Sequence, residues 1–98
     1  MPDLPSGTVT FLFSDIEGST NLLRELGDGY AAALGTHRDV VRTAFASYSG
    51  VEVDTQGDAF FGAFARASDA VAAAEEIQRE LATGPVRVRI GVHTDDPR

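Results

Sequence analysis

The run from Thr8 to Phe13 constrains the fold most, because all but one of its residues are β-branched or aromatic and its later part is apolar on both faces. Such a run is typical of a central strand that other elements cover. The polar residues Ser14–Thr20 follow it directly and predict a turn that leads into a helix. The chain therefore needs partner strands beside this segment and helices packed against it.

The remaining residues alternate between helical and strand patterns. Apolar side chains recur every three or four positions in the helical segments and every second position in the last strand. In chain order, the predicted elements are a helix capped by Ser19 or Thr20, a helix over Tyr30–Tyr48, strands over 51–55 and 58–64 joined by a Gln56-Gly57 turn, a helix capped by Ser68, and a strand over Val86–His93.

The element order is therefore β-α-α-β-β-α-β within one α+β domain over residues 1–98, with 1–7 as an irregular leading segment. Short connections and right-handed crossovers favour a ferredoxin-like fold, a four-stranded antiparallel-type sheet with the helices on one face. In this arrangement the first strand lies centrally beside strand 58–64. We therefore expect Asp15 and Asp58 to lie at the same edge of the sheet.

The charged residues exclude several classes of function. The net charge is −7, the eight basic residues are all arginine, and there is no cysteine. A P-loop lysine, a disulfide framework and a thiolate zinc site are thus excluded. The acidic balance disfavours a nucleic-acid partner but suits divalent cations. With no membrane span or signal peptide in the sequence, we expect a soluble, cytoplasmic protein.

Two aspartates on neighbouring strands could share a hard cation. Magnesium takes only one or two protein carboxylates when a nucleotide supplies phosphate oxygens, so Asp15 and Asp58 would suffice. The Glu17–Thr20 segment, at a helix N-terminus, would attract the phosphates. Each residue also has a purely structural interpretation, Asp15 and Asp58 as turn residues and Ser19 or Thr20 as a helix cap.

Three segments, Val9–Thr20, Glu52–Phe61 and Val86–Thr94, resemble the class III adenylate/guanylate cyclase catalytic domain in order and spacing. The resemblance implies cyclisation of a nucleoside triphosphate, ATP or GTP, with release of pyrophosphate, in cyclic-nucleotide signalling. It also implies a homodimer or a complementing cyclase half as partner. The implied site residues are Asp15, Ile16 (through its carbonyl) and Asp58 for two Mg²⁺ or Mn²⁺ ions, and Gly18, Ser19 and Thr20 for the triphosphate.

This sequence departs from the family pattern at particular positions. Asp54 stands where adenylate cyclases usually place a purine-reading lysine and guanylate cyclases a glutamate, and Asp95 replaces a usual glycine. Residues 1–98 also contain no counterpart of the family's second half, which carries a further purine-reading residue and the asparagine and arginine that stabilise the transition state. We therefore expect a partial domain that is inactive alone.

Two other functions compete with a cyclase. One is a non-catalytic module that binds a metal–nucleotide or regulates a partner. The other is a diguanylate-cyclase-like domain, because Gly57–Phe60 lies in the kind of hairpin that carries that family's acidic signature. Outside these motifs, we expect His37 to be a partly buried histidine with satisfied hydrogen bonds, and Arg87 and Arg89 to be solvated.

Overall fold

The structure, a computed structural model, describes residues 8–95 and confirms the predicted element order. The leading segment predicted for 1–7 lies outside the described residues. The elements are β1 (Val9–Ile16), α1 (Ser19–Leu26), a short 3₁₀ turn η1 (Gly27–Gly29), α2 (Tyr30–Ser47), β2 (Val51–Gln56), β3 (Ala59–Phe64), α3 (Ala67–Leu81) and β4 (Val88–Asp95).

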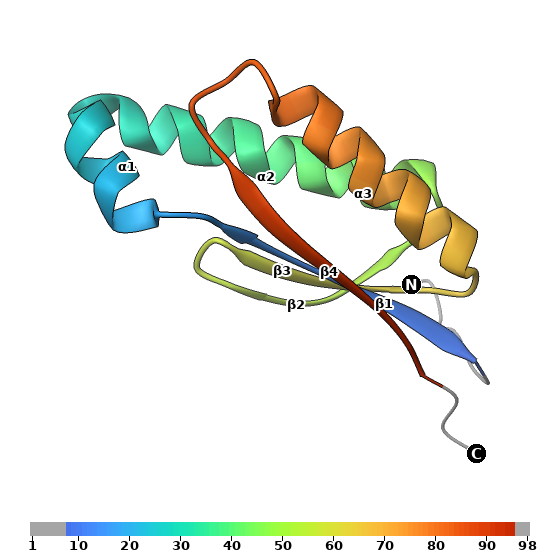
Figure 1. The fold of residues 1–98 in the computed structure, drawn as a ribbon. Coiled ribbons are helices and arrows are strands. Elements are labelled where there is room, and N and C mark those ends of the chain that lie inside the picture. The colour runs from blue at the N-terminus through green and yellow to red at the C-terminus, as the bar shows by residue number, and fades with distance from the viewer. Residues whose placement is uncertain (1–7, 96–98) are drawn as a thin grey trace.

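The four strands form one antiparallel sheet in the order β2-β3-β1-β4, so β1 is an inner strand beside β3 as predicted. Figure 1 shows the helices on one face of the sheet and the turn of the β2–β3 hairpin near the end of β1 that leads to α1. The ferredoxin-like prediction is therefore confirmed. Its consequence for function is that the two segments carrying Asp15 and Asp58 meet.

The two faces of β1 differ in their surroundings. Leu12, Ser14 and Ile16 are buried towards the helices, where the hydrophobic core lies. Phe13 points to the other face and is 41% exposed. The central strand that the apolar run predicts is thus covered by helices on one face only, since alternation along a strand sends Phe11 and Phe13 to the other face.

Several strand boundaries differ from those predicted, and the differences at the end of β1 and at the hairpin move the site. β1 continues through Ser14 and Asp15 to Ile16, because pairing with β4 runs to Ile16 opposite Val88. The hairpin turn is Gly57-Asp58 rather than Gln56-Gly57, because Gln56 still pairs with Ala59. Gly57 has φ 61°, a conformation that favours glycine in a tight turn. Asp58 therefore lies in the turn and not in the returning strand.

The helix ends also differ from the sequence-based expectations. α1 is capped by Gly18 and α3 follows Arg66, neither with a side-chain cap bond, so Ser19, Thr20 and Ser68 lie inside their helices. α2 ends with Ser49 at φ 60° and the Gly50 amide bonded to the Phe45 carbonyl. Glycine is required at position 50 for space, since a Cβ there would lie 2.5 Å from the Phe64 ring.

No helix within residues 8–95 is both long and apolar enough to cross a membrane.

Candidate active site

Asp15 and Asp58 lie at one end of the β1–β3 pair. Ser14 pairs with Phe60, which places Asp15 one residue beyond the last registered pair and Asp58 two residues before Phe60 in the hairpin turn. Both side chains are half-buried. Asp15 is positioned by its pairing with Arg89 of β4, whereas Asp58 is positioned by the tight turn.

The charges of these two carboxylates act on each other. Burial raises the pKa of Asp58 above its ordinary value, and the negative charge of Asp15 raises it further. The positive charge of Arg89 opposes this effect and lowers the same pKa. A cation placed between two carboxylates that repel each other would stabilise the charged form of both.

Arg89 supplies a positive charge beside one of these carboxylates. Its Nη2 lies 3.0 Å from Oδ2 of Asp15, and the two residues are register partners on β4 and β1. Arg89 is solvated as expected, with its side chain 66% exposed, but the strand register also places its guanidinium beside an aspartate. Arg87, by contrast, donates to the carbonyl oxygens of Gly84 and Val86.

The donor set suits a hard divalent cation that also has a phosphate ligand. Carboxylate oxygens are the ligands that Mg²⁺ and Mn²⁺ prefer, and Mg²⁺ binds through one or two of them. Among residues 8–95, no group of three or more His, Cys, Asp or Glu side chains is arranged to hold a metal. The remaining ligands would therefore have to come from water, backbone carbonyls such as that of Ile16, or a bound phosphate.

The turn between β1 and α1 leaves a helix N-terminus open. Gly18 has φ 63°, and a Cβ built there meets no atom within 4 Å. As the N-cap residue it has no side chain to bond the first amides of α1, while its carbonyl accepts from the Leu22 amide. Ser19 is half-buried and Thr20 exposed in the first turn. Uncapped amides at a helix start favour an anionic group.

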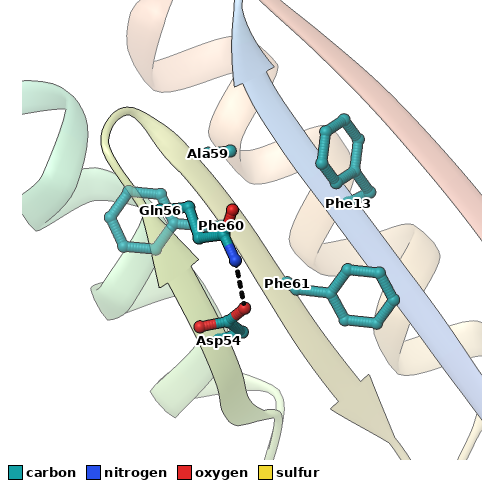
Figure 2. A pocket seen from close by; sticks show the side chains of 6 residues that line it. All are labelled: Phe13, Asp54, Gln56, Ala59, Phe60 and Phe61. Carbon is teal, nitrogen blue, oxygen red and sulfur yellow. Dashed lines mark hydrogen bonds between the residues drawn. The ribbon is translucent and has the colours of Figure 1, made fainter.

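A shallow recess of about 200 Å³ lies on the open face of the sheet, beside Asp54. Figure 2 shows Phe13 and Phe61 on neighbouring strands and the hydrogen bond between Asp54 and Gln56. Gln56 Nε2 donates to Oδ2 of Asp54 at 3.1 Å, and the Thr55 amide donates to Oδ1 at 2.9 Å. The Asp54 carboxylate is thus held in one orientation next to two exposed aromatic rings.

The chain matches the model of a known protein family along nearly its whole length. The model of the adenylate and guanylate cyclase catalytic domain matches residues 1–96. The chain belongs to this cyclase family. Enzymes of the family generally use divalent metal ions, which agrees with the carboxylate pair.

This chain covers only part of the length of the proteins that it resembles. An uncharacterised protein of Mycobacterium tuberculosis is 40% identical over 94 residues, which are 94% of this chain and 33% of the relative. An adenylate cyclase structure from Trypanosoma brucei matches 95% of this chain and 58% of its own, with 29% identity and TM-score 0.81. A guanylate cyclase domain from Catenaria anguillulae, solved with GTP, shares the fold at 22% identity and TM-score 0.76, over 90% of this chain and 56% of its own.

Arg89 and Gln56 are residues of the candidate site that sequence reasoning missed. Period-two alternation puts Arg89 on the face opposite Val88 and Ile90, but only the β1–β4 register shows that Asp15 is its neighbour. Gln56 was expected to be a turn residue. Its pairing with Ala59 keeps it in β2, two positions after Asp54 and on the same face.

His37 lies behind the candidate site, in the core. It is 1% exposed, packs edge-on against Phe60 with ring centroids 5.6 Å apart, and its Nε2 has no hydrogen-bond partner among the described residues. The expectation of a histidine with satisfied hydrogen bonds is therefore wrong. Burial lowers the pKa of His37, as does the charge of Arg38, while the charge of Asp15 has the opposite effect.

We expect the His37→Leu variant to lose part of the acid sensitivity of this domain. A histidine with a lowered pKa binds fewer protons when folded than when unfolded, so its contribution to stability is complete above about pH 6.5 and declines as the pH falls towards the folded pKa. Urea unfolding of the wild type and the variant between pH 7.5 and pH 5 measures the difference. His93→Gln, which alters an exposed histidine, is the control. Identical pH profiles for wild type and His37→Leu would contradict the prediction.

Proposed function

We propose that residues 1–98 form the metal- and phosphate-binding half of a cytoplasmic nucleotide cyclase domain, which converts ATP or GTP to a 3′,5′-cyclic nucleotide and pyrophosphate. The observation that carries this proposal is the apposition of Asp15 and Asp58 in a chain of the cyclase family. In the reaction, the ribose 3′ oxygen attacks the α-phosphorus, and the bond from that phosphorus to the bridging oxygen of the pyrophosphate breaks.

Each part of the site has a proposed role. Asp15, Asp58 and the Ile16 carbonyl would hold two Mg²⁺ or Mn²⁺ ions, which when bound stabilise the attacking and leaving oxygens. The open amides at Gly18, Ser19 and Thr20 support a role in binding the triphosphate, because they sit at a helix N-terminus that follows Asp15 closely along the chain.

We further propose that Asp54 contacts the purine. Its carboxylate can accept hydrogen bonds, and both adenine and guanine carry an exocyclic amino group that donates them. The neighbouring rings of Phe13 and Phe61 offer an apolar surface on which a base could stack. The family's active sites combine two cyclase halves, so the partner would be a second copy of the domain or a complementing half.

A melting experiment tests the metal–nucleotide site. With Mn²⁺ and ATP or GTP at about ten times Kd, linkage predicts about 1.4 kcal/mol of stabilisation and therefore a rise in Tm of roughly 5–10 °C. The rise should disappear when Asp15→Asn and Asp58→Asn are combined. The same pair of changes at exposed Asp28 and Asp39 controls for net charge and should leave the rise intact.

Two results would contradict the proposed site. A wild-type chain whose Tm does not respond to any metal–nucleotide combination would remove the basis for the proposal. A response that persists in the Asp15→Asn, Asp58→Asn variant would place the ligand elsewhere on the chain.

A further inference from the structure

The ion pair between Arg89 and Asp15 occupies an oxygen that the proposed metal site needs. Arg89 Nη2 lies 3.0 Å from Asp15 Oδ2, and the side chains are 66% and 23% exposed. The register opposes these two residues on β1 and β4, so the contact follows from the fold rather than from a chance side-chain position. A cation that binds through this oxygen has to displace the guanidinium or share the oxygen with it.

The charge of Arg89 reaches both carboxylates. Besides its contact with Asp15, it lowers the pKa of Asp58, against the effects of burial and of Asp15. A guanidinium keeps its charge at every accessible pH, so it cannot become a neutral neighbour when a metal ion arrives. Because the arginine is largely exposed, its side chain can leave the pair at small cost.

We propose that Arg89 is a positioning residue for Asp15. Before a metal ion binds, its guanidinium holds the Asp15 carboxylate, and it competes with divalent cations for that carboxylate. The inference rests on the proposed function, because it assumes that Asp15 and Asp58 bind a metal. Arg89 would keep two mutually repelling carboxylates together before the substrate arrives. It would also weaken the binding of a free divalent ion that comes without a nucleotide.

The test uses Mn²⁺ alone as the ligand, with free Mn²⁺ followed by electron paramagnetic resonance. In Arg89→Gln we expect Mn²⁺ to bind about three- to tenfold more tightly, because a unit charge a few ångströms from a divalent ion is removed. The gain should shrink between about 20 mM and about 200 mM NaCl, since screening weakens the repulsion. Arg89→Lys, which keeps the charge, should stay within about twofold of wild type.

Arg79→Gln is the matched control for net charge. Arg79 is exposed on α3, which packs on the helix-covered face of the sheet. We expect its Mn²⁺ affinity to equal that of wild type, and the melting temperature of each metal-free variant reports whether it is folded.

The outcomes separate the inference from the proposed function. Binding of Mn²⁺ that requires Asp15 and Asp58 but is unchanged or weaker in Arg89→Gln overturns the competition role of Arg89 and leaves the metal site standing. Binding that is absent in wild type, or unaffected by Asp15→Asn with Asp58→Asn, overturns the proposed metal site and the inference with it.

Discussion

Purified residues 1–98 should form little or no cyclic nucleotide when incubated with Mn²⁺ and either ATP or GTP. The proposed site supplies the metal and phosphate contacts, but the chain corresponds to only 58% of the matching Trypanosoma brucei cyclase chain. Residues 1–98 have no counterpart of the family's transition-state arginine and asparagine. Each missing electrostatic contact of this kind typically lowers kcat about 100- to 1,000-fold. Separation of labelled products by chromatography measures the turnover.

A complementation experiment tests whether the missing half of the domain accounts for the lack of activity. The C-terminal half of a related cyclase, added in trans or fused to residue 98, should restore product formation if the two halves assemble. Restored activity should disappear in Asp15→Asn, because that change removes a proposed metal ligand. Robust turnover by residues 1–98 alone, abolished by Asp15→Asn, would show that unrecognised residues supply the missing contacts.

Replacing Phe60 by alanine should cost about 3–5 kcal/mol of folding free energy, the usual range for a buried Phe→Ala change. Phe60 is 1% exposed, its ring packs edge-on against His37, and the Arg42 guanidinium lies 5.6 Å from its centroid. For a domain of this size the total stability is about 5–15 kcal/mol, so this one substitution approaches the unfolding threshold. Urea denaturation gives the difference.

The neighbouring phenylalanine is the matched control. Phe61 follows Phe60 in β3 but points to the open face and is 37% exposed, packing on Phe11 and Phe13. Because less apolar area returns to water, Phe61→Ala should cost clearly less, about 1–1.5 kcal/mol. Equal costs for the two substitutions would mean that the open face is covered in solution.

The secondary structure and its order could be predicted from the sequence because they depend on local periodicity. The β-branched and aromatic run along 9–13, the alternation along 88–93 and the spacings of three and four along α2 each reflect strand or helix geometry alone. The hairpin follows from Gly57, which adopts a positive φ at little cost. With short connections these elements allow few topologies, so the meeting of the Asp15 and Asp58 segments was predictable as well.

The ends of elements and the exposure of single side chains depended on tertiary contacts instead. β1 extends through Asp15 because β4 pairs with it that far, and no local signal in Ser14-Asp15 indicates this. Val71 and Val92 fit the apolar stripes of α3 and β4, yet they are 46% and 42% exposed. Periodicity shows which side chains share a face, but not how far the neighbouring elements extend over that face.

The candidate site divides in the same way. Residue type and motif spacing were enough to identify Asp15, Asp58 and the Gly18 turn as candidates. Carboxylates are ligands for hard cations, and the start of a helix binds anions. The Arg89–Asp15 ion pair, the Gln56–Asp54 hydrogen bond and the unpartnered His37 nitrogen, all among residues 8–95, could not be identified in this way. Each depends on a strand register or on packing between layers, and sequence spacing determines neither of these.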